Sequence, residues 1–391
     1  MPRLRRFALL GAAAVLGIAA SVPRPPLPPY AGAYEPQSVD ERGLWMQLDE
    51  AERTLRDSAF VVKDATLTGY VRAVLCRTVG VERCMGTRVY VIRDPEFNAS
   101  MTPNGTLVVN TGLFMRVRDE AELAAVLGHE FAHFEQRHGL HRFQHSRSMT
   151  DVAAWMGVIA ASGASYQIRS AAVDVSHSTI GSIFAFNRDE EREADMLGAK
   201  YMLAAGYDPK ALPDIWTRAM DEADATSFGR KQKSHRYDRL SFFASHPTNL
   251  ERATYLRGLV AGMGQGDTGH DALRTAIKPL RGAFIADQLK LNDFGGTEYL
   301  FGQLAGDAWD AELLRARGDL YRARGNPRDL VSAAGFYAQA IALDPADADA
   351  YRGLGLARLR GGDAQGAEAL KRYLALRPDA PDRAMIQALL P

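Results

Sequence analysis

The chain has 391 residues with 47 basic and 47 acidic side chains, so its formal net charge is zero. This balance argues against a nucleic-acid-binding protein and against a protein that reads membranes through a basic patch. Hydrophobic residues make up 47% and charged residues 24% of the chain, as in ordinary globular proteins. Disordered, collagen-like and multi-span membrane classes are therefore excluded, and the length predicts two or three domains.

The N-terminus has the pattern of an export signal. Three early arginines precede an apolar run over residues 7–20, and a Pro-rich tract follows. A basic start, an apolar centre and small residues before the cleavage point are typical of a secretory signal peptide. We expect residues 1–33 to form this signal and Pro-rich segment, with cleavage after Ala20 or Ala33, and the protein to be periplasmic or otherwise exported. The alternative is an uncleaved membrane anchor, because residues 7–22 fall only slightly short of the roughly 18 to 20 that a spanning helix needs.

Cys76 and Cys84 are the only two cysteines. They could be two buried free thiols that pack as small hydrophobic side chains. In an exported protein, however, an even number of cysteines at short spacing favours a disulfide. We therefore expect a bridge between the end of a helix that starts at Ala65 and a strand that starts near Arg88.

The next segment predicts a mixture of helix and sheet. Apolar residues at helical spacing predict helical structure over residues 38–76, and strand-forming residues predict strands over 88–92 and 106–110. We interpret residues 98–105 as the turn before the second strand, because they include Pro103-Asn104-Gly105. If the 106–110 strand is the sheet edge above a cleft, it would hold an extended substrate by β-augmentation.

A helix that begins at Asp119 carries the most informative motif. Its acidic first turn and apolar stripe predict an amphipathic helix. Residues 129–133 read H-E-x-x-H, which places the imidazoles of His129 and His133 on one helix face, where they can bind one Zn²⁺. Glu130 would lie beside the open position of the metal, where a general base for the attacking water is needed. The alternative is two structural histidines on a half-buried helix.

A catalytic zinc needs a third protein ligand. The metzincin pattern fails, since it needs Gly and His where the chain has Gln136 and Gly139. A further helix, predicted over residues 187–206, places Glu191 and Asp195 on one face at i, i+4. Glu191 can complete a His₂Glu site, and Asp195 can orient one imidazole from behind.

The two motifs together resemble the family-48 metallopeptidases, which include HtpX-like, CAAX-prenyl-protease and BepA-like proteins. The second motif, over residues 187–198, reads N-R-x-x-E-x-x-A-D-x-x-G, and Glu122–Gly128 and Ser245–Pro247 through Arg252 also agree with the family pattern. The resemblance covers about residues 60–260 and is greatest to the exported BepA-like branch. It implies a zinc endopeptidase that acts on exported or envelope proteins in protein quality control.

The same resemblance places His246 beside the metal. There it would either stabilise the oxyanion of the tetrahedral intermediate or occupy the fourth position of zinc as a latch. Three other histidines, His138, His141 and His145, follow the end of the motif helix. We expect them to be solvated, because positive charge is favourable at the negative end of the helix dipole.

The C-terminal part has a different sequence pattern, in which predicted helices are separated by Gly and Asp-Pro. Pro345 and Pro378 are 33 residues apart in similar segments, which matches the tetratricopeptide pattern. We expect a metallopeptidase domain over residues 38–265, a helical connector over 266–308 and about two repeats over 309–391. Stacked repeats leave a concave surface, so this unit is expected to bind a protein partner.

The sequence thus predicts an α+β protein, with a mostly helical zincin-type domain, a small β-sheet and an α-helical repeat domain. We expect a zinc metalloendopeptidase with one Zn²⁺ per chain, protein or peptide substrates and no nucleic-acid partner. The main alternative is an envelope chaperone or assembly factor in which the repeats bind clients and the zinc site is latched. A non-peptidase zinc hydrolase is a third interpretation.

Overall fold

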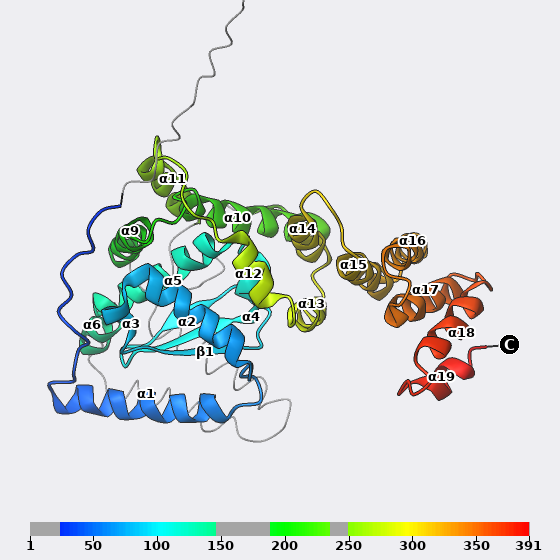
Figure 1. Cartoon of the computed structure of the whole chain (residues 1–391), viewed down its shortest axis with the longest axis horizontal. Coiled ribbons are helices and arrows are strands. Elements are labelled where there is room, and N and C mark those ends of the chain that lie inside the picture. Colours follow the sequence, from blue (N-terminus) through cyan, green and yellow to red (C-terminus); the bar gives the residue numbers. More distant parts are fainter. Residues whose placement is uncertain (1–23, 146–187, 235–248, 391) are drawn as a thin grey trace, which may run out of the picture.

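The computed structural model describes residues 24–145, 188–234 and 249–390 (Figure 1). The first range contains α1 (Val39–Asp57), α2 (Ala65–Val79), α3 (Val81–Cys84), β1 (Arg88–Ile92), β2 (Ala99–Met101), β3 (Thr106–Asn110), α4 (Thr111–Arg116), α5 (Glu120–Glu135) and α6 (His138–His145). The later ranges contain α9 (Arg188–Ala204), α10 (Ala211–Gly229), α11 (Asn249–Val260), α12 (His270–Ile277), α13 (Arg281–Lys290), α14 (Phe294–Ala305), α15 (Ala311–Arg324), α16 (Pro327–Leu343), α17 (Ala348–Arg360), α18 (Gly366–Leu376) and α19 (Arg383–Gln387). The predicted mostly helical α+β fold is confirmed.

The three strands form one sheet in the order β1-β3-β2. β1 is parallel to β3, and β2 is antiparallel to β3. The condition under which residues 106–110 would hold a substrate is not met, because β3 is the central strand and is buried along its whole length. The edge next to α5 is β2, within the segment that the sequence assigned to a turn. Its three residues are fewer than the four to eight from which a strand can be recognised.

The helical stretch expected over residues 38–76 is two helices. α1 ends at Asp57, and α2 begins after Asp64, whose carboxylate accepts a hydrogen bond from the backbone N–H of Leu67. Residues between the two helices reach the sheet, where Val61 forms an isolated bridge with Ile92. The N-cap therefore overrides the helical spacing of the apolar residues.

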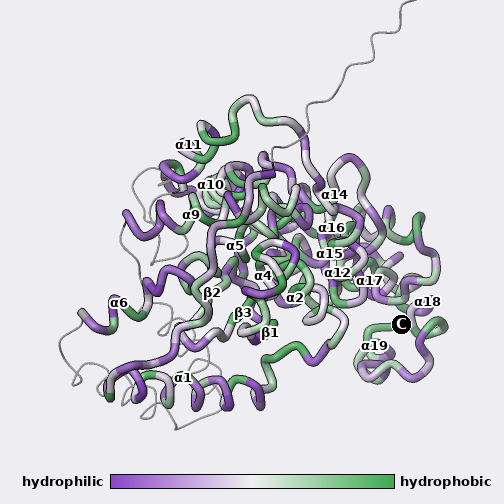
Figure 2. The backbone as a smooth tube through the Cα atoms, turned by 60° about the vertical axis from the view of Figure 1, so that its left-hand side comes forward, coloured by the Kyte–Doolittle hydropathy of each residue, from purple (hydrophilic) through white to green (hydrophobic). Residues whose placement is uncertain are grey.

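The hydrophobic core lies where α2, α5 and α9 pack together over the sheet. α5 starts at an Asp119 N-cap that accepts from the backbone N–H of Glu122, and it is buried from Glu120 to His133. Figure 2 shows hydrophobic stretches gathered in this interior, whereas α1 at the periphery alternates between hydrophilic and hydrophobic residues. The motif helix is thus a core element, which fixes the position of its polar side chains.

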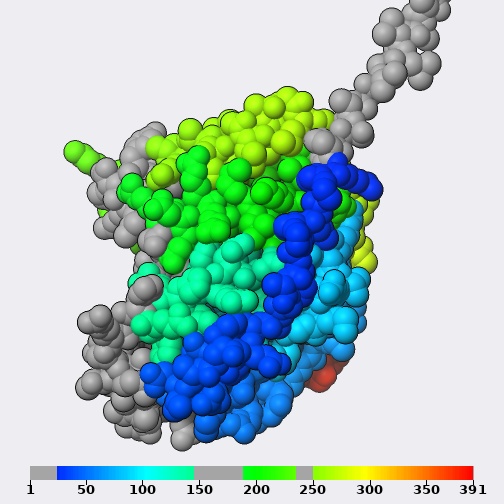
Figure 3. All heavy atoms as spheres, turned by 90° about the vertical axis from the view of Figure 1, so that its left-hand side faces the viewer, coloured from blue at the N-terminus to red at the C-terminus, as the bar shows by residue number. Residues whose placement is uncertain are grey.

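An extended N-terminal segment, residues 24–37, runs across one face of the molecule (Figure 3). Arg83 donates to the carbonyl of Pro28 and lies 4.9 Å from the ring centroid of Tyr30. The apolar run of the predicted signal peptide or membrane anchor, residues 7–22, lies outside the described ranges. Among the helices that are described, none combines the length and the apolar character needed to cross a membrane.

The C-terminal helices α15 to α18 pack against one another in chain order (Figure 1). Small residues allow the close contacts, since a Cβ on Gly353 would lie 2.3 Å from the ring of Tyr337, and one on Gly355 would lie 2.6 Å from the side chain of Leu370. α15 also contributes Leu313 to the hydrophobic cluster that extends from the N-terminal part. The expected domain boundary at residue 309 therefore does not interrupt the core, and the domain division remains a prediction.

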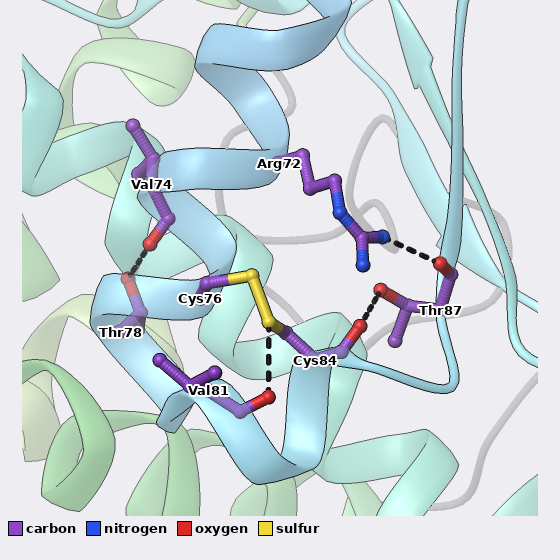
Figure 4. Close-up of a disulfide and its surroundings, with 7 residues drawn as sticks. All are labelled: Arg72, Val74, Cys76, Thr78, Val81, Cys84 and Thr87. Carbon is purple, nitrogen blue, oxygen red and sulfur yellow. Dashed lines mark hydrogen bonds between the residues drawn. A yellow bond between two sulfur atoms is a disulfide. The ribbon is translucent and has the colours of Figure 1, made fainter.

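The predicted disulfide between Cys76 and Cys84 is confirmed (Figure 4). It joins α2 to the short helix α3, and the Cα atoms of the two cysteines are 5.1 Å apart. The same corner is held by Arg72, which donates to the carbonyl of Thr87 at 2.7 Å, so that the start of β1 is fixed against α2.

We expect loss of this bridge to lower stability without changing the fold. The bridge closes a loop with a sequence separation of 8, so the chain-entropy model gives about 2–3 kcal/mol of stabilisation. The double variant Cys76→Ala, Cys84→Ala should therefore unfold at lower urea concentration than the wild type under oxidising conditions. With reductant present the two proteins should unfold almost together. Equal stability under oxidising conditions would contradict the prediction.

Candidate metal centre

The centre is built where α5 crosses α9 at two glycines. A Cβ on Gly198 of α9 would lie 2.9 Å from the backbone nitrogen of His129 and 3.1 Å from the backbone carbonyl carbon of Gly128. Real Cβ atoms do not approach a backbone this closely, so the crossing requires glycine at position 198. The close approach brings the carboxylates of α9 within reach of the histidines of α5.

The structure brings the three predicted ligands together at this crossing. The Nε2 atoms of His129 and His133 are 3.1 Å apart. Nε2 of His133 lies 3.3 Å from one carboxylate oxygen of Glu191, and Nε2 of His129 lies 3.5 Å from the other. All three residues are buried, and Glu191 is 0% exposed. Two imidazoles and a carboxylate that converge within 4.8 Å make a donor set that fits a divalent metal ion.

Glu130 follows the first histidine and is buried in the same region. Burial raises the pKa of its carboxyl to about 7, and the neighbouring Glu191 acts in the same direction. A carboxylate with such a pKa can both accept and release a proton near neutrality, as a general base must.

Asp195 lies behind the first imidazole, as its spacing on α9 predicts. Its Oδ1 is 2.8 Å from Nδ1 of His129, which leaves Nε2 of that ring directed toward the metal position. Tyr255 also donates to Asp195. Burial alone would raise the pKa of Asp195, but Arg252 and His129 together hold it below its usual range. Asp195 is therefore ionised and can fix the orientation of His129.

The residue that sequence reasoning did not assign to the site is Arg252. Its side chain is 0% exposed, donates from Nε to Asp195 at 2.8 Å and lies 3.7 Å from Glu191 through Nη1. Its guanidinium carbon is 3.7 Å from the ring centroid of Trp216. Buried carboxylates require a cation nearby. This requirement, together with the agreement of Arg252 with the family pattern, was the available signal for it.

The prediction that His138 is solvated is wrong. His138 is 3% exposed, and its Nδ1 lies 2.8 Å from Nδ1 of His133. Burial lowers its pKa, so the neutral imidazole is favoured, contrary to the cation expected at a helix end. His141 is exposed, as expected. His246 and the side chain of His145 lie outside what the structure describes.

We expect Gly198→Ala to weaken metal binding although it changes no ligand. The added methyl group must push α9 away from α5 and so displace Glu191 and Asp195 from the histidines. The free energy of unfolding should fall by about 1–3 kcal/mol, and the affinity for Zn²⁺ by about tenfold or more. Chelator competition and urea unfolding measure the two effects.

The matched control is Gly258→Ala on α11, where a Cβ meets nothing within 4 Å. This variant should keep the wild-type affinity for metal, because its methyl group points into open space. If Gly198→Ala binds metal as tightly as Gly258→Ala, the close crossing does not position the ligands.

Comparison with known proteins places this centre in a family. The model of peptidase family M48 matches residues 65–260, which include every residue of the centre described above. The beta-barrel assembly-enhancing protease of Escherichia coli K12 is 29% identical over 191 residues, which cover 47% of this chain and 39% of that protein.

Two further relatives have different names. The mitochondrial metalloendopeptidase OMA1 of Schizosaccharomyces pombe is 32% identical over 189 residues, covering 47% of this chain and 50% of that protein. The metalloprotease YcaL of Escherichia coli K12 is 30% identical over 175 residues, covering 44% of this chain and 61% of that protein. In each case the match spans less than two thirds of the relative. The match to the family model extends over half of this chain and confirms the resemblance seen in its motifs: the chain belongs to peptidase family M48.

Proposed function

We propose that the protein is a zinc-dependent endopeptidase whose metal is bound by His129, His133 and Glu191. The observation that supports this most directly is the spacing of the three ligands. A tetrahedral zinc site with bonds of about 2.0–2.1 Å has edges of about 3.3–3.4 Å. The three distances in the structure are 3.1, 3.3 and 3.5 Å. The side chains are thus preorganised for a small tetrahedral cation rather than for a larger ion such as Ca²⁺.

The residues around the metal position have complementary roles in peptide hydrolysis. When bound, zinc supplies a Lewis acid that polarises the scissile carbonyl and acidifies the attacking water. Glu130 takes a proton from that water and returns it to the nitrogen of the leaving amine. Asp195, which Arg252 holds in place, accepts the proton of Nδ1 of His129 and so fixes the tautomer that presents Nε2 to the metal position.

We assign substrate binding to the edge of the sheet formed by β2. Within the described residues, β2 pairs with β3 on one side and with no strand on the other. It also lies next to α5, which carries the metal ligands. A peptide that pairs with β2 would be held extended along the centre by backbone hydrogen bonds, the arrangement that cleavage of a peptide bond requires.

We further propose exported or envelope proteins as the substrates and a periplasmic location for the enzyme. The grounds are the export signal in the sequence, the Cys76–Cys84 disulfide and the likeness to a protease named for β-barrel assembly. An oxidising compartment is where such a bridge persists. The alternative function as a chaperone with a latched site is not favoured, because the general base and all three ligands are present.

The C-terminal helices are proposed to be tetratricopeptide-like and to recruit a protein partner. They leave a hollow of about 400 Å³ lined by both signs of charge, including Arg315, Asp347 and Arg377. A polar hollow of this kind suits a partner with its own charged residues. His246, with its two alternative roles as oxyanion stabiliser or zinc latch, stays a prediction from the family resemblance.

Substitutions of the general base Glu130 and of the third ligand Glu191 should have different effects. Glu130→Gln should keep one zinc per chain but slow peptide hydrolysis by at least about a hundredfold, since only proton transfer is lost. Glu191→Ala should lose both zinc and activity, because a ligand is removed. Zinc content by elemental analysis and cleavage of a fluorogenic peptide measure the two outcomes.

Glu368→Gln on the distant helix α18 is the matched control for loss of a carboxylate and should behave as the wild type. Full activity in Glu130→Gln, or an unchanged zinc content in Glu191→Ala, would overturn the assignment.

A further inference from the structure

A strained turn directs a buried histidine at the second metal ligand. α5 ends at Glu135, and Arg137 then adopts a φ of 59°, in the left-handed region that non-glycine residues rarely occupy. A continuous helix would place residue 138 about 140° around the axis from His133. The turn after α5 instead brings His138 back into contact with His133. Backbone conformations of this kind persist only when the surrounding contacts hold them.

The two imidazoles meet through their Nδ1 atoms, which are 2.8 Å apart. A contact this short between two nitrogens requires one to donate a proton and the other to accept it. His133 directs Nε2 to the metal position, so its Nδ1 carries the proton. His138 therefore accepts at Nδ1, carries its own proton on Nε2 and directs it toward Glu193, whose carboxylate oxygen is 3.4 Å away.

We propose that His138 is a positioning residue for the metal ligand His133, with Glu193 at the outer end of the chain of contacts. This inference rests on the proposed metal site. It assigns a role to a residue that is not one of the three metal ligands. His133 would be oriented by His138 and Glu193, as His129 is oriented by Asp195 and Arg252. One helix, α9, thereby supplies the third ligand Glu191 and, within four residues, the carboxylates that support both histidines.

The carboxylates of Asp195 and Glu193, which support the two histidines, differ in burial. This difference has a measurable consequence for metal binding. Asp195 is buried and ionised, whereas the side chain of Glu193 is 56% exposed. Water can replace much of what an exposed carboxylate contributes, but it cannot easily replace the buried acceptor at His138. We therefore expect the effect to lie mainly in His138 and only slightly in Glu193.

The test compares two substitutions of nearly equal shape. The variant His138→Asn would place an amide oxygen where Nδ1 now lies, so the proton of His133 keeps an acceptor. His138→Leu offers a similar volume and no acceptor. We expect His138→Leu to raise the dissociation constant for Zn²⁺ by about 10–100-fold, His138→Asn by less than about threefold, and Glu193→Gln by no more than that. Competition with a chromophoric chelator measures the constants.

The order of the two variants separates positioning from packing. If His138 only fills space, the apolar Leu should bind metal at least as well as Asn and stabilise the metal-free protein more. Such a result would overturn the inference, as would equal affinities for the two variants. His141→Leu, an exposed change on the same helix α6, should bind Zn²⁺ as the wild type does. A wild-type protein that binds no Zn²⁺ would instead overturn the proposed metal site itself.

Discussion

The close crossing of α5 and α9 is the constraint on which the rest of the centre depends. Gly198 lets the two backbones approach to a distance that a side chain at this position would not allow, and it lies against Gly128 and His129 of α5. Only at that distance does a Glu on α9 reach two histidines that lie one turn apart on α5. Both helices are buried, so the ligands are held by the packing of the core rather than by flexible loops. Metal affinity and core stability therefore come from the same contacts.

The buried carboxylates of the centre outnumber its buried cation. Glu130, Glu191 and Asp195 are buried, and Arg252 is the guanidinium that lies against Glu191 and Asp195. With neutral imidazoles, the group keeps a net negative charge in a region from which water is largely excluded. Such a group is costly to bury unless further positive charge is present. A divalent ion at the ligand position provides that charge, and Arg252 limits the repulsion between the two carboxylates before it binds.

The sequence predicts those features of the centre that depend on the spacing of residues along one helix. His129 and His133 share a face because they are four residues apart on a helix, and the same spacing relates Glu191 to Asp195. The pairing of Cys76 with Cys84 followed from their number and proximity.

What the sequence could not predict depends on tertiary geometry. Arg252 lies 123 residues from His129 along the chain, and only the packing of α11 brings the two together. The role of His138 depends on a left-handed residue that no periodicity reveals, and the sheet edge depends on a strand of three residues.

The most direct test of the account is the position of a bound metal. Crystals of the wild-type protein grown with Zn²⁺ should give one anomalous peak per chain at the zinc absorption edge. The account predicts that this peak lies about 2.0–2.2 Å from Nε2 of His129, Nε2 of His133 and a carboxylate oxygen of Glu191. The absence of a peak at this crossing of α5 and α9, or a peak held by other side chains, would contradict it.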